Sequence, residues 1–216
     1  MVYYYRMLSV PIDTDSALKY FKKNDALMHD LLQSSQNSTN PITIPQPLPK
    51  SKYFNSIVKS IVSQQISVKA ARSIYSRVEE VLVKVNTESV IEIDFEELKA
   101  CGLSAQKTNY IKKSAKLWHE IPVGNFVHLD NEAIITELTK LPGIGRWTAE
   151  MFLMFSLARP DVFSFGDLGL MQSLYRNYNY KPHYVRKIRT TVQDWSPHRT
   201  LASLALWHQK DNSPVA

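Results

Sequence analysis

Residues 141–150 read Leu-Pro-Gly-Ile-Gly-Arg-Trp-Thr-Ala-Glu, a glycine-rich turn that leads directly into a helical stretch. Gly143 and Gly145 lack Cβ atoms, so the backbone can turn sharply and another molecule can approach it closely. The first N–H groups of the following helix have no partner within it and favour an anion such as a phosphate. Because residues 132–138 have helical apolar spacing, we expect a helix, a hairpin and a second helix. A plain turn between two core helices would also contain Pro-Gly-x-Gly.

The length and composition of the chain exclude several classes of protein. A chain of 216 residues can bury a core in one domain or in two closely packed lobes. No apolar run approaches the ~20 residues of a membrane span, and no secretory signal is evident, so we expect an intracellular protein without a membrane partner. The single cysteine, Cys101, can form neither an internal disulfide nor an iron–sulfur cluster. The six histidines show no metal-ligand spacing, so we expect no metal bound by side chains.

The positive charge of the chain is concentrated around the hairpin. The formal net charge is +6, and residues 140–210 contain 10 Lys and Arg against 4 Asp and Glu. A phosphate-binding turn inside a basic segment indicates a nucleic acid partner. A basic surface that serves only solubility is the alternative.

The apolar spacing predicts an all-α protein with nine or ten short helices and no internal repeat. Residues 33–52 are rich in Ser, Asn, Pro and Lys and are expected to form a linker, so that residues 1–52 would be an N-terminal helix and linker packing on a core of residues 53–216. Ser67, Ser104 and Asp167 are candidate N-caps. We expect helices at residues 15–32, two within 53–83, and at 95–101, 105–120, 132–138, 168–176, 182–193 and 197–209.

The hairpin sequence, followed by Asp167, resembles the helix-hairpin-helix (HhH-GPD) DNA glycosylase superfamily. Three further stretches resemble its 3-methyladenine DNA glycosylase II branch, which acts in alkylation repair: residues 61–67, residues 98–104 and the helix that carries Trp207. The resemblance covers about residues 50 to 210 and implies a two-lobed helical fold with a cleft between the lobes. Longer members have an N-terminal β-rich domain, which we do not expect in a chain of this length.

The resemblance implies that Asp167 is the catalytic residue. In a glycosylase, a carboxylate can stabilise the positive charge that develops on the sugar or can orient water. Gly166-Asp167-Leu168 also suits a simple helix N-cap, and the two roles are compatible. Asp161 is the rival carboxylate in the same loop.

The residue after Gly145-Arg146 indicates the type of reaction. In the lyase branch of the superfamily, a lysine at this position forms a Schiff base with the sugar. This chain has Trp147 there, and an indole cannot attack a sugar. We therefore expect a monofunctional enzyme that hydrolyses the N-glycosidic bond without AP-lyase activity.

A base within a duplex must be flipped out before an enzyme can reach it. By resemblance, Trp147 and Trp207 line the pocket that receives the base, and Met151 completes its floor. An indole face attracts a positively charged alkylpurine. Core packing is the alternative for either tryptophan, and more so for Trp207, which has Leu204 and Leu206 close by in the sequence.

The resemblance also implies a set of DNA contacts. The hairpin would bind through Gly143, Ile144, Gly145 and Arg146, and a Na⁺ or K⁺ ion can lie on its backbone carbonyls near Leu141 and Gly143. A plug that fills the vacated space in the duplex is expected in residues 102–104. Leu103 has the bulk for it, although a core role is equally consistent with the sequence. The remaining candidates for DNA contact are Gln64, Gln65, Ser67 and Ser104.

The sequence therefore predicts a monomeric enzyme that excises alkylated purines, of the 3-methyladenine and 7-methylguanine type, from double-stranded DNA in base excision repair. It would be associated with DNA in a bacterial cytoplasm or nucleoid, or in a nucleus. A glycosylase for another lesion, such as uracil or hypoxanthine, would share the fold and the site. A non-catalytic helix-hairpin-helix module that only binds DNA is the alternative from another class.

Overall fold

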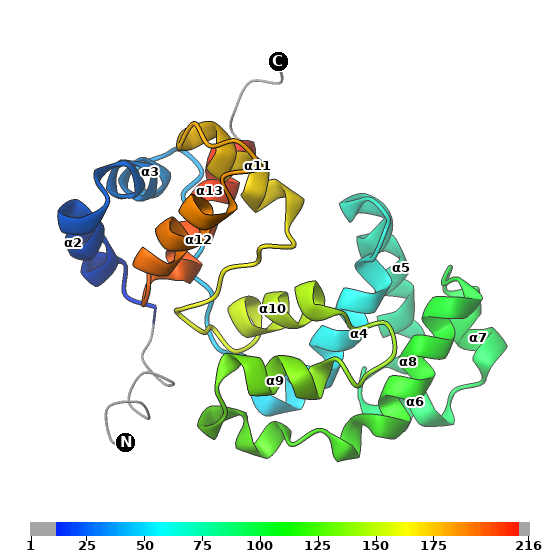
Figure 1. Ribbon diagram of the computed structural model, residues 1–216. Coiled ribbons are helices and arrows are strands. Elements are labelled where there is room, and N and C mark those ends of the chain that lie inside the picture. The colour runs from blue at the N-terminus through cyan, green and yellow to red at the C-terminus, as the bar shows by residue number, and fades with distance from the viewer. Residues whose placement is uncertain (1–11, 212–216) are drawn as a thin grey trace. The chain divides into compact units, whose positions relative to one another are not determined.

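The computed structural model describes residues 12–211, which form twelve α-helices, three short 3-10 helices and no β-strand (Figure 1). The predicted all-α class is confirmed. None of the helices in this range has the length and apolar character needed to span a membrane. The chain divides into two compact units, of which the first contains residues 1–46 and 153–216 and the second contains residues 47–152.

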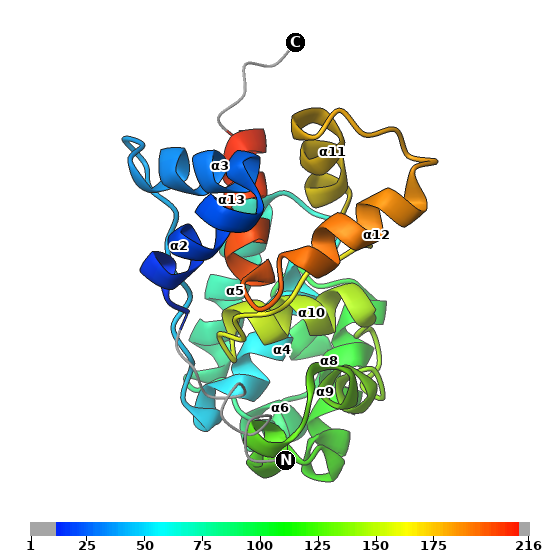
Figure 2. The same cartoon turned by 60° about the vertical axis from the view of Figure 1, so that its left-hand side comes forward.

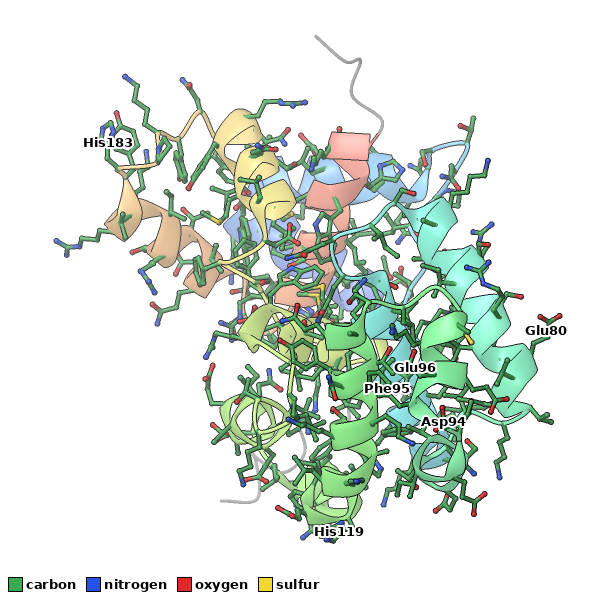
Figure 3. The ribbon with its side chains drawn as sticks, turned by 90° about the vertical axis from the view of Figure 1, so that its right-hand side faces the viewer. Glu80, Asp94, Phe95, Glu96, His119 and His183 are labelled. Atoms are coloured by element: carbon green, nitrogen blue, oxygen red, sulfur yellow. The ribbon has the colours of Figure 1, made fainter. Side chains whose placement is uncertain are left out.

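The second unit is built around α4 and α8. The α4 helix packs against α5 and α8, and α8 in turn contacts α6 and α7. Short polar residues begin these helices: Ser67 accepts a hydrogen bond from Ala70 N–H, Ser104 accepts one from Lys107 N–H, and Asp94 caps α7 (Figure 3). The elements of the unit are η1 (Lys50–Lys52), α4 (Tyr53–Ser63), α5 (Val68–Leu82), α6 (Thr87–Glu92), α7 (Phe95–Ala100), α8 (Ala105–Leu117), η2 (Trp118–Glu120), η3 (Val123–His128), α9 (Asn131–Leu138) and most of α10 (Arg146–Phe155).

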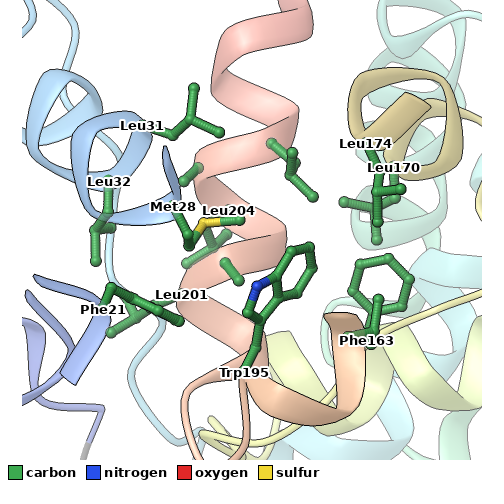
Figure 4. Close-up of a cluster of buried hydrophobic side chains, with 14 of the residues drawn as sticks. Phe21, Met28, Leu31, Leu32, Phe163, Leu170, Leu174, Trp195, Leu201 and Leu204 are labelled. Carbon is green, nitrogen blue, oxygen red and sulfur yellow. The ribbon is translucent and has the colours of Figure 1, made fainter. Parts of the chain in front are cut away.

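The first unit combines helices from the N-terminal and the C-terminal parts of the described residues. Helix α13 (Arg199–Asp211) lies beside α3 (Ala26–Gln36) and α11 (Leu168–Asn177), while α2 (Thr14–Asn24) packs on α3 (Figures 1 and 2). Helix α12 (Val185–Asp194) precedes α13. The fully buried Trp195 and the nearby Phe163 occupy the centre of the apolar core between these helices (Figure 4).

Residues 15–32 form two helices rather than the single helix expected. The chain leaves helical geometry at Asp25, whose backbone N–H bonds to Phe21 O while its side chain accepts a hydrogen bond from Met28 N–H. Tyr178 Oη and Trp195 Nε1 also donate to this carboxylate, over 2.7 and 2.8 Å. The break is therefore held by contacts with residues far along the chain, which local spacing does not reveal.

Three other expectations are corrected. Helix α12 begins at Val185 instead of residue 182, because residues 181–184 form a turn closed by Tyr184 N–H and Lys181 O. Helix α13 begins at Arg199 instead of residue 197, and the hydroxyl of Ser196, which precedes it, donates to Asp161. The division at residue 52 is replaced by the two units above, in which α2 and α3 associate with the C-terminal helices.

Candidate active site and DNA-binding hairpin

The hairpin of residues 139–145 joins α9 to α10, as predicted. Gly143 has a φ of +81°, and a Cβ atom there would lie 2.3 Å from Tyr110 Cδ2, so both the turn and its packing on α8 require glycine. A Cβ atom on Gly145 would meet nothing within 4 Å. Gly145 therefore borders open space, where another molecule can approach the backbone.

The predicted hairpin contacts depend on backbone N–H groups, and one of these groups already donates a hydrogen bond within the protein. The N–H of Ile144 donates to Leu141 O over 3.1 Å, which corrects the expectation that this N–H contacts DNA. The N–H groups of Gly143 and Gly145 make no hydrogen bond to the described residues. These two groups are therefore the hairpin donors that an anion can use.

Arg146 is held by carboxylates within the protein. Its guanidinium bonds to both oxygens of Glu132 at the start of α9, and its Nε donates to Glu150 Oε1 over 2.9 Å. The hydrogen bond to Arg146 lowers the pKa of Glu132 and outweighs the opposing effect of burial. Arg146 thus ties the two hairpin helices together, while its contact with DNA stays a prediction.

Gln64 also supports the hairpin instead of facing outward. Its Nε2 donates to Gly143 O over 2.8 Å, and the Lys107 ammonium donates to the backbone oxygens of Val62 and Gln64. Burial lowers the pKa of Lys107. Helices α4 and α8 thereby fix the position of the hairpin, and Gln64 is corrected from a DNA contact to a supporting residue.

The remaining candidates of the second unit differ in exposure. Gln65 is exposed and has a φ of +57°, so its side chain stands at the tip of the sharp α4–α5 turn. The caps Ser67 and Ser104 are exposed as well. Leu103, in contrast, is only 6% exposed, which favours the core role over that of a plug in the duplex.

In the first unit, Asp167 caps α11, as predicted. Its Oδ1 accepts hydrogen bonds from Leu170 N–H over 2.7 Å and from the Trp207 indole N–H over 3.1 Å. Both bonds end on the same oxygen and hold the carboxylate in one orientation at the first turn of the helix. Asp167 therefore both caps α11 and places a carboxylate next to the Trp207 ring.

Trp207 is half-buried, and its aromatic partner Phe155 is not among the residues expected from the sequence. Phe155, at the end of α10, stacks on the Trp207 ring with 6.0 Å between centroids and 30° between planes. Phe155 is 44% exposed. The pair forms an apolar wall next to Asp167.

Residues 147, 151 and 155 recur every four positions and therefore share one side of α10. Trp147 is 46% exposed, which argues against a simple core role, and Met151 is partly buried. The same spacing in the sequence would have identified Phe155 as a third candidate.

Lys210 reaches the start of α11 because residue 169 is glycine. A Cβ atom on Gly169 would lie 3.0 Å from Lys210 Nζ and 3.1 Å from Asp167 Oδ1. An ammonium group and the candidate catalytic carboxylate therefore border the same small space. Lys210 and Gly169 carry no local sequence signal that could have linked them to Asp167.

The rival carboxylate, Asp161, has a structural role. Arg199 binds its two oxygens over 2.6 and 2.7 Å, and the Ser196 hydroxyl donates to it over 2.8 Å. Burial opposes ionisation of Asp161, but the hydrogen bonds and charge of Arg199 prevail and lower its pKa. Asp161 anchors its loop to α13, which leaves Asp167 as the carboxylate next to the aromatic wall.

Comparisons with known proteins identify the family of the chain. The family model for HhH-GPD superfamily base excision DNA repair proteins matches residues 58–198. DNA-3-methyladenine glycosylase 1 of Schizosaccharomyces pombe is 35% identical over 170 residues, which cover 73% of this chain and 72% of the relative.

Solved structures extend the similarity to most of the chain. A DNA-3-methyladenine glycosidase from Bacillus halodurans superposes with a TM-score of 0.78 at 31% identity and covers 91% of this chain and 89% of its own. The 3-methyladenine DNA glycosylase Mag1 of S. pombe, in complex with abasic DNA, superposes with a TM-score of 0.72 at 27% identity, covering 91% and 97%. The chain belongs to the HhH-GPD superfamily of base excision DNA repair proteins, within the alkylation-repair branch of 3-methyladenine DNA glycosylases.

Proposed function

We propose that this protein is a monofunctional DNA glycosylase that acts as a monomer and removes 3-methyladenine- and 7-methylguanine-type bases from duplex DNA. The observation that carries the proposal is the Asp167 carboxylate, oriented by Leu170 N–H and the Trp207 indole beside the Phe155–Trp207 stack. The three relatives described above are named 3-methyladenine glycosylases or glycosidases, which supports the same activity.

The chemistry follows from the charge of the substrate. An N3- or N7-alkylated purine is cationic, so it leaves readily as a neutral base and requires no strong general acid. As the C1′–N bond breaks, positive charge develops on the sugar, and the Asp167 carboxylate stabilises it and orients the attacking water. Hydrogen bonds that hold the carboxylate before the reaction reduce the reorganisation needed in the transition state.

Recognition of the base depends on aromatic side chains. By resemblance, we assign Trp147, Met151 and Trp207 to recognition of the flipped base, because an electron-rich indole ring attracts a cationic purine. Phe155 stacks on Trp207 and extends its aromatic surface. An uncharged normal purine gains less from this contact and is also a poorer leaving group. Selectivity for alkylated bases therefore rests on charge at both steps.

Trp147 supports release of the base without strand cleavage. It occupies the position at which the lyase branch carries a nucleophilic lysine, and an indole nitrogen cannot form a Schiff base with the sugar. Water is then the nucleophile, and the product is an intact strand with an abasic site.

We assign DNA binding to the N–H groups of Gly143 and Gly145. Ser67 and Ser104, which are exposed in the same unit, are further candidate contacts. Gln65 replaces Leu103 as the candidate wedge in the duplex, since it is exposed at a tight turn. The carbonyl oxygen of Leu141 accepts a hydrogen bond from Ile144 N–H, and that of Gly143 accepts one from Gln64 Nε2. Because a carbonyl oxygen has two lone pairs, we assign the candidate Na⁺ or K⁺ site to these two carbonyls. Such an ion would strengthen the attraction of the hairpin for a phosphate.

Duplex DNA methylated with a simple alkylating agent tests the activity. The protein is expected to release free 7-methylguanine and 3-methyladenine, detected by chromatography, and to leave sites that break only after alkali. Strand breaks without alkali would show that the protein is a lyase. Binding without release of any base would show that it is a non-catalytic DNA-binding module.

A panel of duplexes, each with one defined lesion, tests the substrate range. Cationic N-alkylpurines are expected to be cleaved faster than hypoxanthine or uracil, because only the former carry the charge that the indole faces and the leaving step use. Faster removal of uracil or hypoxanthine would assign the same fold and site to another lesion.

A further inference from the structure

Helix α12 carries a basic surface that the proposed site does not use. Five Lys and Arg residues and no Asp or Glu lie between Asp167 and Asp194. Three of the five, Arg186, Lys187 and Arg189, are exposed on α12, while Ile188 and Val192 face the core. We call these three residues the α12 basic surface; His183 marks the turn that leads into the helix in Figure 3.

The charge of the α12 basic surface is not neutralised within the described residues. Arg146 and Arg199 each bind a carboxylate, whereas no ion pair found in residues 12–211 involves Arg186, Lys187 or Arg189. Arg186 and Arg189 are three positions apart on the same short helix, where like charges repel each other and disfavour the helix. The fold thus gains no ion pair from them, which points to an anion outside the protein.

The α12 basic surface is attached to the loop that presents Asp167. The Arg189 guanidinium lies 5.1 Å from the centre of the Phe165 ring, and Phe165 is two residues before Asp167. The Lys187 ammonium lies 4.8 Å from the Tyr180 ring. These cation–π contacts hold two of the three cations while leaving them exposed. An anion bound by Arg189 would therefore lie near the end of the loop where the sugar must reach Asp167.

We propose that the α12 basic surface binds the sugar–phosphate backbone of the DNA close to the damaged nucleotide, as a contact additional to the hairpin. Phosphates are the regular, closely spaced anions that a set of adjacent Arg and Lys side chains matches. Such contacts carry no sequence information, which suits an enzyme that must act on a lesion in any sequence. The position close to the damaged nucleotide rests on the proposed function, in which the sugar of that nucleotide reaches Asp167.

The salt dependence of DNA binding tests the proposal. The triple variant Arg186→Gln, Lys187→Gln, Arg189→Gln is compared with the wild type for binding to an abasic duplex at several NaCl concentrations. Each lost phosphate contact reduces the slope of log K against log salt by about 0.9, so loss of all three reduces it by roughly 2.7. Undamaged duplex is expected to show the same reduction, because the contacts are with the backbone.

The matched control is Lys19→Gln, Lys22→Gln, Lys23→Gln on α2. It removes three exposed positive charges from the same unit, so a general effect of net charge appears equally in both variants. Circular dichroism and thermal unfolding check that each variant folds. If the triple variant does not fold, the single variant Arg186→Gln is used, since Arg186 stacks on no ring in the described structure, and it is expected to reduce the slope by about 0.9.

Two results would overturn the proposal. One is a slope in the α12 variant equal to that of the wild type or to that of the α2 control. The other is an unchanged slope for DNA together with lost binding of a polyglutamate peptide, which would assign the α12 basic surface to an acidic protein partner. A reduced slope in a protein that excises no base would uphold this surface and reject the proposed glycosylase activity.

Discussion

Asp161 and Asp167 lie six residues apart in one loop, yet their surroundings give them different roles. Asp161 binds Arg199 and Ser196, whereas Asp167 binds a helix N–H and an indole N–H beside an aromatic stack. The family motif favours Asp167, but the sequence alone does not show which residues bind the Asp161 carboxylate. Its partners come from residues 35 and 38 positions away, which no local pattern reveals.

Replacing Trp207 with phenylalanine separates orientation of the carboxylate from base stacking. Trp207→Phe keeps an aromatic ring but removes the N–H that donates to Asp167 Oδ1. A hydrogen bond to a charged group contributes about 1.5–3 kcal/mol, so single-turnover excision is expected to slow roughly 10- to 100-fold. Affinity for an abasic duplex should change little. The comparison variant Phe155→Leu keeps the indole N–H and should weaken recognition of the methylated base more than the chemical step.

Gly169→Ala tests the space shared by Asp167 and Lys210. The added Cβ atom would lie 3.0 Å from Lys210 Nζ and 3.1 Å from Asp167 Oδ1, so one of the two groups must move. Excision is expected to slow, while the protein keeps its stability because alanine favours a helix over glycine by about 1 kcal/mol. Gly166→Ala is the control, since its Cβ atom would meet nothing within 4 Å. Equal rates for both variants would show that the space has no role in the reaction.

At the level of elements, residues with strong local signals were predicted well. The hairpin, the caps Ser67, Ser104 and Asp167, and the helix ending before Gly102 all occur as expected. The expectations that were wrong depend on distant contacts. Asp25 breaks a helix because its carboxylate binds Tyr178 and Trp195, and Gln64 turns inward because the Gly143 carbonyl accepts its amide N–H.

The two hairpin glycines are expected to respond differently to alanine. Gly143→Ala imposes a positive φ on alanine and places a Cβ atom 2.3 Å from the Tyr110 ring, which should cost roughly 1–3 kcal/mol of stability. Gly145→Ala meets open space within the protein, so its stability should stay within about 0.5 kcal/mol of the wild type while DNA binding weakens. Urea unfolding and duplex binding measure the two effects. Equal destabilisation by both variants would contradict this assignment.

At the level of the whole molecule, the division of the chain into units was not predictable from composition. The polar linker suggested a boundary near residue 52, but α3 packs on α13, so the first unit combines helices from the N-terminal and the C-terminal parts of the described residues. Apolar spacing shows that a helix has a buried face, but it does not show which distant helix covers that face.

The Asp161–Arg199 ion pair should make stability depend on pH. Because the folded state lowers the pKa of Asp161, the pair stabilises the protein fully above the unfolded value of about 3.9, and this contribution is lost as the pH falls below it. Asp161→Asn is expected to reduce the free energy of unfolding by roughly 1–3 kcal/mol at pH 6. The difference from the wild type should shrink as the pH approaches 3. A difference that is the same at pH 6 and pH 3 would show that the charge of Asp161 is not the cause.

The most direct test of the account compares Asp167→Asn with the wild type on duplex DNA that contains 7-methylguanine. The asparagine can still cap α11 and accept the Trp207 N–H, but it lacks the negative charge that stabilises the sugar cation. We predict that single-turnover release of 7-methylguanine falls roughly 100-fold or more, while affinity for the same duplex and the thermal unfolding temperature stay close to those of the wild type. Release of the base at the wild-type rate by the folded Asp167→Asn protein would contradict the central claim that this carboxylate drives excision.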